Sequence, residues 1–271
     1  MKIDEILPEP VCIVPFLNAG KGPGAFYKDQ LPVHLARSRS LPDGVSAVVV
    51  TADLQGRELF SDSGGQPIRL LGEVLPQRLI NDILPGIGHA NPTETGVILA
   101  GDFYTVPALD KRGGTGDVSS VWDAFAREFA WVVGVAGNHD VFGPDGKPQP
   151  SRTAANVHFL DDSSCRIGGQ LFAGLGGIIG NPERPQRRSE DDYLTAFGRL
   201  LARRPDVLIM HDGPQGTQKR QPGNLRLNEL ADYEPPGLIV RGHAHWLDPL
   251  STSNYLQILN VDARVVIIER I

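Results

Sequence analysis

Short apolar runs alternate along the chain with longer segments in which apolar residues recur at helical spacing. The runs are continuous and rich in β-branched residues, which is typical of strands buried on both faces of a sheet. The longer segments, at residues 68–84, 118–129 and 191–203, predict helices. The predicted strands are residues 45–50, 96–100, 131–136, 171–173, 207–210 and 238–240. This alternation indicates an α/β fold with a largely parallel sheet built from βαβ units.

The two ends of the chain differ from this pattern. Two apolar runs separated by a polar break predict an antiparallel hairpin at residues 251–271. Residues 1–44 precede the first predicted core strand and are expected to pack against the core as an extension. No fixed-period repeat or linker divides the chain, so we expect one domain over residues 1–271, with its functional motifs in residues 45–250.

Composition narrows the class of protein. Of the 271 residues, 41% are hydrophobic and 21% are charged, as in an ordinary globular protein. The net charge of −6 makes nucleic acid an unlikely partner, because phosphate recognition needs clustered Lys and Arg. The two cysteines, Cys12 and Cys165, are too few for a disulfide framework and predict free thiols. Because the sequence has neither a secretory signal nor an apolar run long enough to span a membrane, we expect a cytoplasmic protein.

Polar residues with metal-binding chemistry follow five of the predicted strands. They are carboxylates, amides and imidazoles, and they stand where parallel strands end, which is where open α/β sheets bind ligands. We therefore expect them to meet at the same edge of one sheet and to bind two divalent cations. In chain order they are Asp53, Gln55, Asp102, Asn138, His139, Asp140, His211, His243 and His245.

The mixture of imidazole and carboxylate groups suits intermediate metals, and we expect manganese, with iron or zinc as alternatives. Two such ions clamp the oxygens of a phosphoryl group, lower the pKa of a bridging water and offset charge on the phosphate. Gly101, Gly137 and Gly242 stand directly before ligand residues, where the absence of a side chain lets the backbone turn sharply. The sequence thus predicts a dinuclear metal site.

The order of these motifs resembles that of the calcineurin-like metallophosphoesterases. The matching segments are Asp53-Leu54-Gln55, Gly101-Asp102, Gly137-Asn138-His139-Asp140, His211 and Gly242-His243-Ala244-His245. The resemblance implies a four-layer α/β/β/α sandwich, in which two mixed sheets are flanked by helices and the metals sit at the strand ends. It also implies that Asp102 binds both ions. Asp53 and His245 would then bind the first ion, and the ligands of the second ion would be Asn138, His211 and His243.

Gln55 departs from the family pattern, which has a histidine at this position. Its amide oxygen is a weaker and harder ligand than imidazole. The first ion would then be held weakly, be Mn or Mg, or be absent from the protein as purified. Gln55 could bind the metal, contact the substrate or a bound water, or have a structural role, and the sequence leaves all three open.

The motif around His139 is expected to act on the substrate. The resemblance implies that His139 lies near the substrate, as an acid for the leaving group or a donor to the phosphoryl oxygens, and that Asp140 orients it. A positioned imidazole can donate a proton near neutral pH, and a neighbouring carboxylate is a plausible partner for it. Asn138 is expected to contact the substrate as well as the second ion.

Three arginines in the proline-rich segment 181–192 are further candidates. Arg184, Arg187 and Arg188 could bind a substrate phosphate through their guanidinium groups. The alternative is a solvated loop face whose charge is balanced by the acidic residues of the same segment.

The sequence therefore predicts a metal-dependent phosphoester hydrolase, in which a metal-bound hydroxide attacks phosphorus and His139 assists the leaving group. The acidic balance favours a small-molecule substrate, a phosphodiester or a nucleotide-like phosphoester, over a macromolecule or a membrane. One alternative is a scaffold of the same fold that binds a protein partner, with Gln55 as a first step in the decay of the metal site. The other is a nuclease of the same superfamily, which would need a basic path that the sequence does not show.

Overall fold

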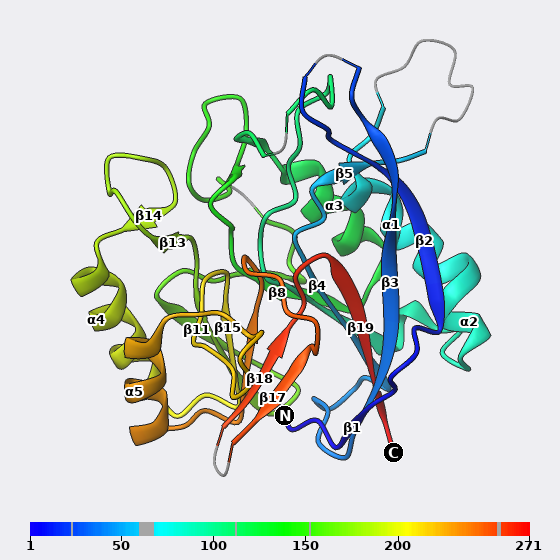
Figure 1. Ribbon diagram of the computed structural model, residues 1–271. Helices are drawn as coiled ribbons and strands as arrows, with labels where there is room; N and C mark the ends of the chain where they lie inside the picture. The colour runs from blue at the N-terminus through cyan, green and yellow to red at the C-terminus, as the bar shows by residue number, and fades with distance from the viewer. Residues whose placement is uncertain (23, 60–67, 112, 152, 254–255) are drawn as a thin grey trace.

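Two β-sheets form the centre of the molecule and helices lie outside them (Figure 1). The computed structural model describes residues 1–271 except 23, 60–67, 112, 152 and 254–255. Both sheets contain parallel and antiparallel pairs, so the predicted α/β class with two mixed sheets is confirmed. Among the described residues, no helix is both long enough and apolar enough to cross a bilayer.

The larger sheet is built around a parallel centre. Successive pairs among β4, β6, β8 and β10 are parallel, whereas β19 is antiparallel to β4 and parallel to β3. Within the described residues its strand order is β10 (Val157–Phe159), β8 (Trp131–Gly134), β6 (Thr95–Leu99), β4 (Ala47–Ala52), β19 (Arg264–Arg270), β3 (Tyr27–Ser38), β2 (Cys12–Asn18) and β5 (Gly56–Arg57), with β1 (Glu5–Ile6) paired to β3.

The smaller sheet also has a parallel centre, formed by β12, β15, β16 and β18, with an antiparallel strand at each edge. Its described strands run in the order β11 (Ser163–Ile167), β12 (Gln170–Leu175), β15 (Val207–Met210), β16 (Leu238–Arg241), β18 (Gln257–Asn260) and β17 (Leu250–Thr252). Two short parallel pairs lie in the connecting segments: β7 (Gly116–Asp117) with β9 (Asp140–Val141), and β13 (Ile178–Ile179) with β14 (Arg187–Arg188).

The helices agree with the predicted periodic segments except in one place. The described helices are α1 (Leu71–Arg78), the π-helical turn η1 (Leu79–Ile83), α2 (Leu84–Gly86), the 3₁₀ turn η2 (Pro92–Glu94), α3 (Ser119–Glu128), α4 (Glu190–Leu201) and α5 (Leu225–Tyr233). The sequence analysis did not predict α5. This helix begins after Asn224, whose side chain accepts a hydrogen bond from the backbone amide of Arg226 at 2.8 Å.

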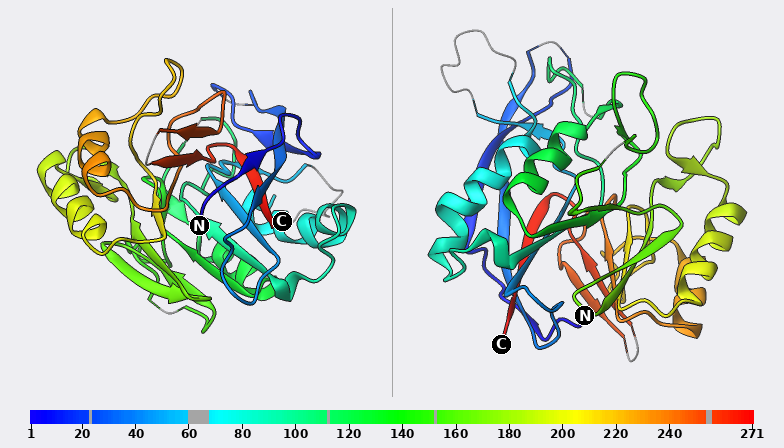
Figure 2. Two further views of the ribbon diagram at one scale, coloured as in Figure 1. Left: turned by 90° about the horizontal axis from the view of Figure 1, so that it is seen from below. Right: turned by 180° about the vertical axis from the view of Figure 1, so that it is seen from behind.

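Side chains on alternate faces of the two sheets fill the three largest apolar cores of the described residues. In β4, Val49 faces α1 and α3, whereas Val48 and Val50 face the second sheet, as the period of two in a strand requires. In β16, Ile239 packs against α4 and α5 while Val240 faces the first sheet. The order of layers is therefore helices, sheet, sheet, helices, and Figure 2 shows α4 and α5 on one side and α1 and α2 on the other.

The C-terminal prediction was wrong in one respect. The two apolar runs at residues 256–259 and 265–268 do not pair with one another. Instead β18 joins the smaller sheet beside β16, and β19 joins the larger sheet between β3 and β4. The reason is burial: both runs are apolar on both faces, and only a place inside a two-sided sheet covers both faces of each strand.

The N-terminal segment is more than a packed extension. Residues 1–44 supply β1, β2 and β3, and β3 hydrogen-bonds along its length to β2 and β19. The predicted metal ligands also follow strands of two sheets rather than one. β4, β6 and β8 belong to the larger sheet, and β15 and β16 belong to the smaller one. The expectation of a single sheet edge is therefore corrected.

Candidate metal centre

Three predicted ligands have backbone conformations that side-chain-bearing residues rarely adopt. The φ angles are 55° at Asp53, 61° at Asp102 and 67° at His243. Asp53 and His243 lie within two residues of a strand end, and Asp102 directly follows Gly101, the second residue after β6. Strained backbone of this kind costs free energy and is found where the surrounding structure holds a functional group in place.

Glycines before or beside these residues allow close approach of the chain. A Cβ atom on Gly137 would lie 2.1 Å from Oδ1 of Asp102, and a Cβ atom on Gly242 would lie 2.3 Å from Oδ2 of Asp53. Both distances are far below van der Waals contact. The two glycines therefore let backbone segments that follow β8 and β16 pack directly against carboxylates that follow β6 and β4.

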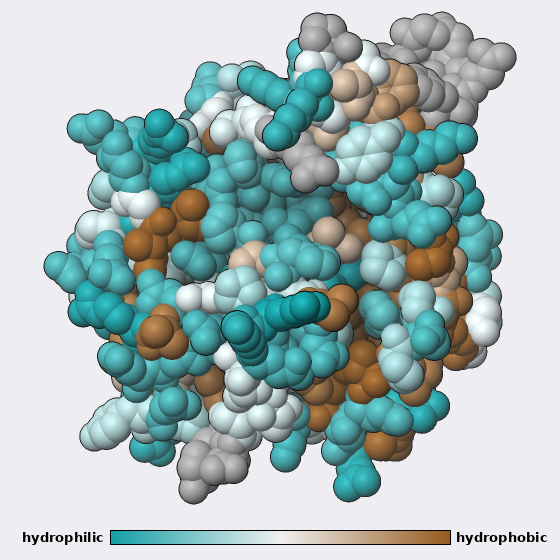
Figure 3. Space-filling view, in the orientation of Figure 1, coloured by the Kyte–Doolittle hydropathy of each residue, from teal (hydrophilic) through white to brown (hydrophobic). Residues whose placement is uncertain are grey.

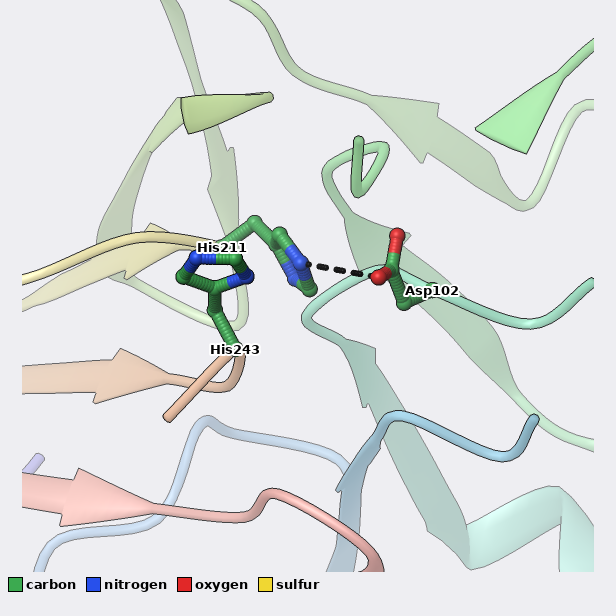
Figure 4. Close-up of side chains that lie close together, drawn as sticks. All are labelled: Asp102, His211 and His243. Carbon is green, nitrogen blue, oxygen red and sulfur yellow. Dashed lines mark ion pairs between the residues drawn. The ribbon is translucent and has the colours of Figure 1, made fainter. Parts of the chain in front are cut away.

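Asp102, His211 and His243 form a compact group of metal-ligating side chains. One ligand atom from each lies within 4.8 Å of the others. Figure 4 shows the Asp102 carboxylate pointing at the His211 imidazole, with the His243 ring beside it. The Nε2 atom of His211 is 3.3 Å from Oδ2 of Asp102, and the two imidazole centroids are 5.1 Å apart. The structure thus brings together three residues that are far apart in the sequence.

Hydrogen bonds fix the orientation of these side chains. Nδ1 of His211 donates to the carbonyl oxygen of Ala100 at 2.8 Å, so its Nε2 atom is the one that faces Asp102. The backbone amide of His139 donates to Oδ1 of Asp102, also at 2.8 Å. Nearby, Oδ1 of Asn138 is buried without any hydrogen-bond partner among the described residues. A buried acceptor without a donor is costly, and a cation would satisfy it.

Burial and mutual charge determine the protonation of the group. Burial disfavours the charged imidazole of His211, but the carboxylates of Asp102 and Asp53 outweigh it and raise the pKa of His211 to about 10. Burial also opposes ionisation of Asp102, but the positive charges of His211 and His139 lower the pKa of that carboxyl below its ordinary value. The buried carboxylate therefore attracts positive charge, which a proton on His211 provides here and which a metal ion could replace.

Asp53 and Gln55 lie beside this group. Oδ2 of Asp53 accepts a hydrogen bond from the backbone amide of His243 at 2.9 Å, and burial raises the pKa of Asp53 well above its ordinary value. Nε2 of Gln55 donates to Oδ2 of Asp102 at 3.2 Å. Gln55 therefore contacts a carboxylate of the candidate metal group through its amide nitrogen, and the three roles considered for it stay open.

His245 has a carboxylate partner that the sequence analysis did not identify. Its side chain is exposed, and Nδ1 lies 2.9 Å from Oδ2 of Asp262, a residue that follows β18. Asp262 also lies close enough to Asp53 to contribute to the rise in its pKa. A histidine whose Nδ1 is held by a carboxylate presents Nε2 for metal binding, which is the usual arrangement of metal-ligating histidines. No spacing signal in the sequence connects Asp262 to the Gly-His-x-His motif.

Asp140 differs from its expected role. Its carboxylate accepts three backbone hydrogen bonds of 2.8 Å, from the amides of Asp102, Phe103 and Gly137, and makes no contact with the His139 imidazole that the structure records. Nδ1 of His139 is buried and has no partner among the described residues. Adjacent residues in this tight turn point in different directions, so Asp140 positions the Asp102 backbone instead of orienting His139. Burial and the Asp102 charge raise the pKa of Asp140 to about 6.

The three predicted arginines have separate environments. Nη2 of Arg188 contacts both carboxylate oxygens of Asp161 at 2.7 Å. Nη1 of Arg187 donates to the carbonyl of Pro185 at 3.4 Å, and Arg184 is exposed. Their segment does reach the Gly-Asn-His-Asp turn, because Nε2 of Gln186 donates to the carbonyl oxygen of Asp140 at 3.3 Å.

A model of the calcineurin-like phosphoesterase family matches residues 47–247, which is most of the chain. The chain belongs to this family. Among solved structures, that of TT1561 from Thermus thermophilus is similar over 81% of this chain and 90% of its own, with 15% identity and a TM-score of 0.52. This likeness shows a shared fold. AQ665 from Aquifex aeolicus, described as a protein of unknown function, shares 11% identity over 80% of this chain and 89% of its own, with a TM-score of 0.31. A search of curated proteins finds no match.

Calcineurin-like phosphoesterases use divalent metals, and the residues of this chain fit such ions. The donors are carboxylate oxygens, an amide oxygen and imidazole nitrogens, which is a set suited to Mn, Fe or Zn. The buried, unpartnered Oδ1 of Asn138 and the close group of Asp102, His211 and His243 are the observations that support the fit. Membership of the family implies metal-dependent hydrolysis of phosphoesters.

Proposed function

We propose that this calcineurin-like phosphoesterase hydrolyses small phosphoesters, with phosphodiesters or nucleotide-like compounds preferred, and that it uses two divalent cations, most favourably manganese. The observation that carries the proposal is the convergence of Asp102, His211 and His243 from two different sheets on one place. Among described residues this group places two imidazoles around a buried carboxylate, a combination of donors that is common at sites for Mn, Fe or Zn.

The ligands divide between two ions as follows. Asp102 would be the ligand shared by both ions, because its carboxylate lies between His211 on one side and Gln55 on the other. Asp53 and His245 belong to the first ion, with the amide oxygen of Gln55 available to it. Asn138, His211 and His243 would hold the second. When bound, such ions lower the pKa of a coordinated water and offset the negative charge of the phosphate.

His139 is the group that we assign to the leaving alcohol. Its side chain is partly exposed, and Nε2 lies 4.0 Å from Oδ2 of Asp102. In the reaction, the oxygen of water bonds to phosphorus and the proton that this water loses passes to solvent. The bond from phosphorus to the ester oxygen breaks, that oxygen takes a proton from His139, and solvent returns a proton to His139. A positioned imidazole is a common general acid for a leaving group. Asn138, adjacent to it, contacts the phosphoryl oxygens in this proposal, and Arg184 and Arg187 remain candidates for binding a substrate phosphate.

The cellular location that fits this proposal is the cytoplasm. Cys12 and Cys165 are both free thiols in the structure. Unpaired cysteines are typical of a reducing compartment. In that compartment, the binding partners that we expect are small-molecule phosphoester substrates.

Turnover by metal-loaded protein tests the proposed function. Protein freed of metal by chelation is given Mn²⁺, Fe²⁺ or Zn²⁺, bound metal is counted by mass spectrometry, and p-nitrophenyl phosphate and bis(p-nitrophenyl) phosphate are supplied as substrates. We expect two ions per chain and turnover that disappears in the chelated protein. Full metal occupancy without turnover of either ester would overturn the hydrolase proposal and favour a binding scaffold.

A further inference from the structure

The chain crosses from the smaller sheet to the larger one through residues 260–264, which we call the crossover segment. β18 ends at Asn260 and β19 begins at Arg264. β18 lies in the lower centre of Figure 1, and the space-filling view from the same side shows mainly hydrophilic side chains around a hollow above it (Figure 3). The match to the family model ends at residue 247, so the crossover segment lies outside it.

Backbone contacts attach the crossover segment to two strands that lead to candidate ligands. The amide of Val261 donates to the carbonyl oxygen of Arg241, the last residue of β16, at 2.8 Å. Asp262 forms a parallel bridge with Ala52, the last residue of β4. The segment therefore lies between the strand end that leads to Asp53 and the strand end that leads to the Gly-His-Ala-His turn.

Two buried side chains of the crossover segment hold the backbone on both sides of His245. Nδ2 of Asn260 donates to the carbonyl oxygen of Ala244 at 2.7 Å. Nη2 of Arg264 donates to the carbonyl oxygen of Trp246. Because Ala244 and Trp246 are the chain neighbours of His245, bonds from a different part of the chain fix the backbone position of this histidine.

The same two side chains hold the carboxylate partner of His245. Oδ1 of Asn260 accepts a hydrogen bond from the backbone amide of Asp262 at 3.1 Å, and Nε of Arg264 donates to the carbonyl oxygen of Asp262 at 3.3 Å. The Asp262 carboxylate in turn lies 2.9 Å from Nδ1 of His245. Asn260 and Arg264 thus each bond both the chain beside His245 and the residue that faces its imidazole.

These contacts matter because the His245 side chain has little packing of its own. It is 67% exposed, whereas Asn260 is fully buried and Arg264 is 4% exposed. An exposed imidazole keeps freedom to rotate, and ordering it costs conformational entropy when a ligand binds. A buried amide or guanidinium group is costly unless it is hydrogen-bonded, so Asn260 and Arg264 are confined to this arrangement. The buried pair therefore gives a fixed geometry to an exposed side chain.

We propose that Asn260 and Arg264 are positioning residues for the first ion, because they present Nε2 of His245 to it in a fixed orientation. The inference rests on the proposed function, in which His245 binds that ion. Among the described residues, neither side chain has a hydrogen bond with a proposed ligand of the second ion. Their removal should therefore weaken binding of the first ion and leave the second in place.

Calorimetric titration of metal-free protein with Mn²⁺ tests the proposal, and His245→Ala identifies the binding step that belongs to the first ion. We expect Asn260→Ala to weaken that step by at least about tenfold and the other step by less than about twofold, since loss of a residue that orients a metal ligand costs about 10- to 100-fold. Arg264→Lys keeps the charge but not the planar fork, so it should weaken the same step.

Asn156→Ala is the matched control. Nδ2 of Asn156 also donates to backbone carbonyl oxygens, those of Ala126 and Phe129 at 2.9 and 3.1 Å, but at the end of α3, where no proposed ligand lies. This variant should lower the temperature of thermal unfolding, as Asn260→Ala does, without changing either binding step. The control thereby separates a loss of stability from a loss of positioning.

A measurement on the metal-free protein reports on the imidazole directly. Relaxation of the ring ¹³Cε1 nucleus gives an order parameter for His245, which measures how freely the ring moves on the picosecond to nanosecond timescale. We expect Asn260→Ala and Arg264→Lys to lower this order parameter and Asn156→Ala to leave it unchanged.

Three results would overturn the inference: a first-ion step of wild-type affinity in the folded variants, an equal loss from both steps, or a His245→Ala protein that keeps both steps. Arg264→Lys decides the question by itself where Asn260→Ala does not fold. Wild-type protein that binds Mn²⁺ at both steps and hydrolyses neither p-nitrophenyl ester would refute the hydrolase proposal alone and leave the inference intact.

Discussion

Nε2 of His211 lies 3.3 Å from Oδ2 of Asp102, and this contact joins the ends of two separate sheets. Asp102 follows β6 of the larger sheet, and His211 follows β15 of the smaller one. The apolar core between the sheets, which includes Ile98 of β6 and Ile209 of β15, fixes the distance between these strand ends. The packing of the sandwich therefore sets the spacing of these candidate metal ligands, and mutations that disturb that packing should also change metal binding.

Replacement of Asp102 by Asn tests its role as the shared ligand. The change keeps the shape of the side chain and removes the charge that attracts a cation. We expect the affinity for Mn²⁺, measured by calorimetry, to fall at least about 100-fold, since changes next to a metal already cost 10- to 100-fold. Turnover should be lost in parallel. Two ions bound with undiminished affinity in Asp102→Asn would show that the metals lie elsewhere.

Gly137→Ala should damage the metal centre without adding any polar group. The new methyl group would lie 2.1 Å from Oδ1 of Asp102, so either the carboxylate or the turn must shift. Gly198→Ala is the matched control, because it lies within α4 and its Cβ would have no neighbour within 4 Å. We expect the control to raise the free energy of unfolding by about 0.5–1 kcal/mol and to leave turnover unchanged. Metal content and thermal unfolding of both variants check this prediction, and wild-type metal binding by Gly137→Ala would contradict it.

His139→Gln should separate proton donation from metal binding. The variant keeps the backbone amide that donates to Asp102, and it loses the imidazole. We expect kcat to fall by about 10²- to 10⁴-fold for alkyl esters, which is the usual contribution of general acid catalysis. The loss should be much smaller for p-nitrophenyl esters, because their leaving group needs no proton. Equal losses for the two kinds of ester would argue that His139 positions the phosphate and does not protonate the alcohol.

Gln55→His should strengthen the first metal site. Imidazole is a better ligand for Mn, Fe and Zn than an amide oxygen. The side chain of Gln55 is partly buried next to Asp53 and donates to Asp102, so a histidine there would face both carboxylates. We expect the weaker of the two metal-binding steps to tighten by about tenfold, a change typical of ligand-shell substitutions, as measured by calorimetry. An unchanged weaker step would place Gln55 outside the metal shell.

Cys165 should react slowly with alkylating reagents. Burial raises the pKa of the Cys165 thiol to about 11, compared with 9.0 for an unperturbed thiol. Near pH 8 the reactive thiolate is then about 100-fold less abundant, because the fraction falls tenfold for each pH unit below the pKa. In a Cys12→Ser background, iodoacetamide should modify Cys165 correspondingly more slowly in the folded protein than in urea. Mass spectrometry of timed samples measures both rates, and equal rates would contradict the expected burial.

Local patterns were sufficient to predict the strands and helices that carry the motifs. The predicted strand at residues 207–210 is observed with the same bounds as β15, and the starts of β6 and β8 differ from prediction by at most one residue. Both faces of these strands are buried, so continuous apolar runs mark them clearly. The candidate ligands follow within a few residues of the strand ends, and in three of the five motifs a glycine precedes them.

Contacts between distant segments could not be predicted from such local patterns. Asp262 pairs with His245, and Asp140 accepts hydrogen bonds from backbone amides. Both interactions depend on where loops meet after the sheets have packed. The same holds for the β2–β3 hairpin, which contributes Asp29 to a cavity beside Asp53.

The sequence by itself determined which residues are candidate metal ligands and in which order they occur, because residue identity and strand-forming runs are local properties of the chain. Only the tertiary structure decided that β18 and β19 separate into different sheets and that ligands from both sheets meet. The physical reason is that the sequence of an apolar strand indicates which of its faces must be buried, but not which neighbouring strand or helix will cover them. That choice is made by the packing of the whole sandwich, in which each sheet covers one face of the other.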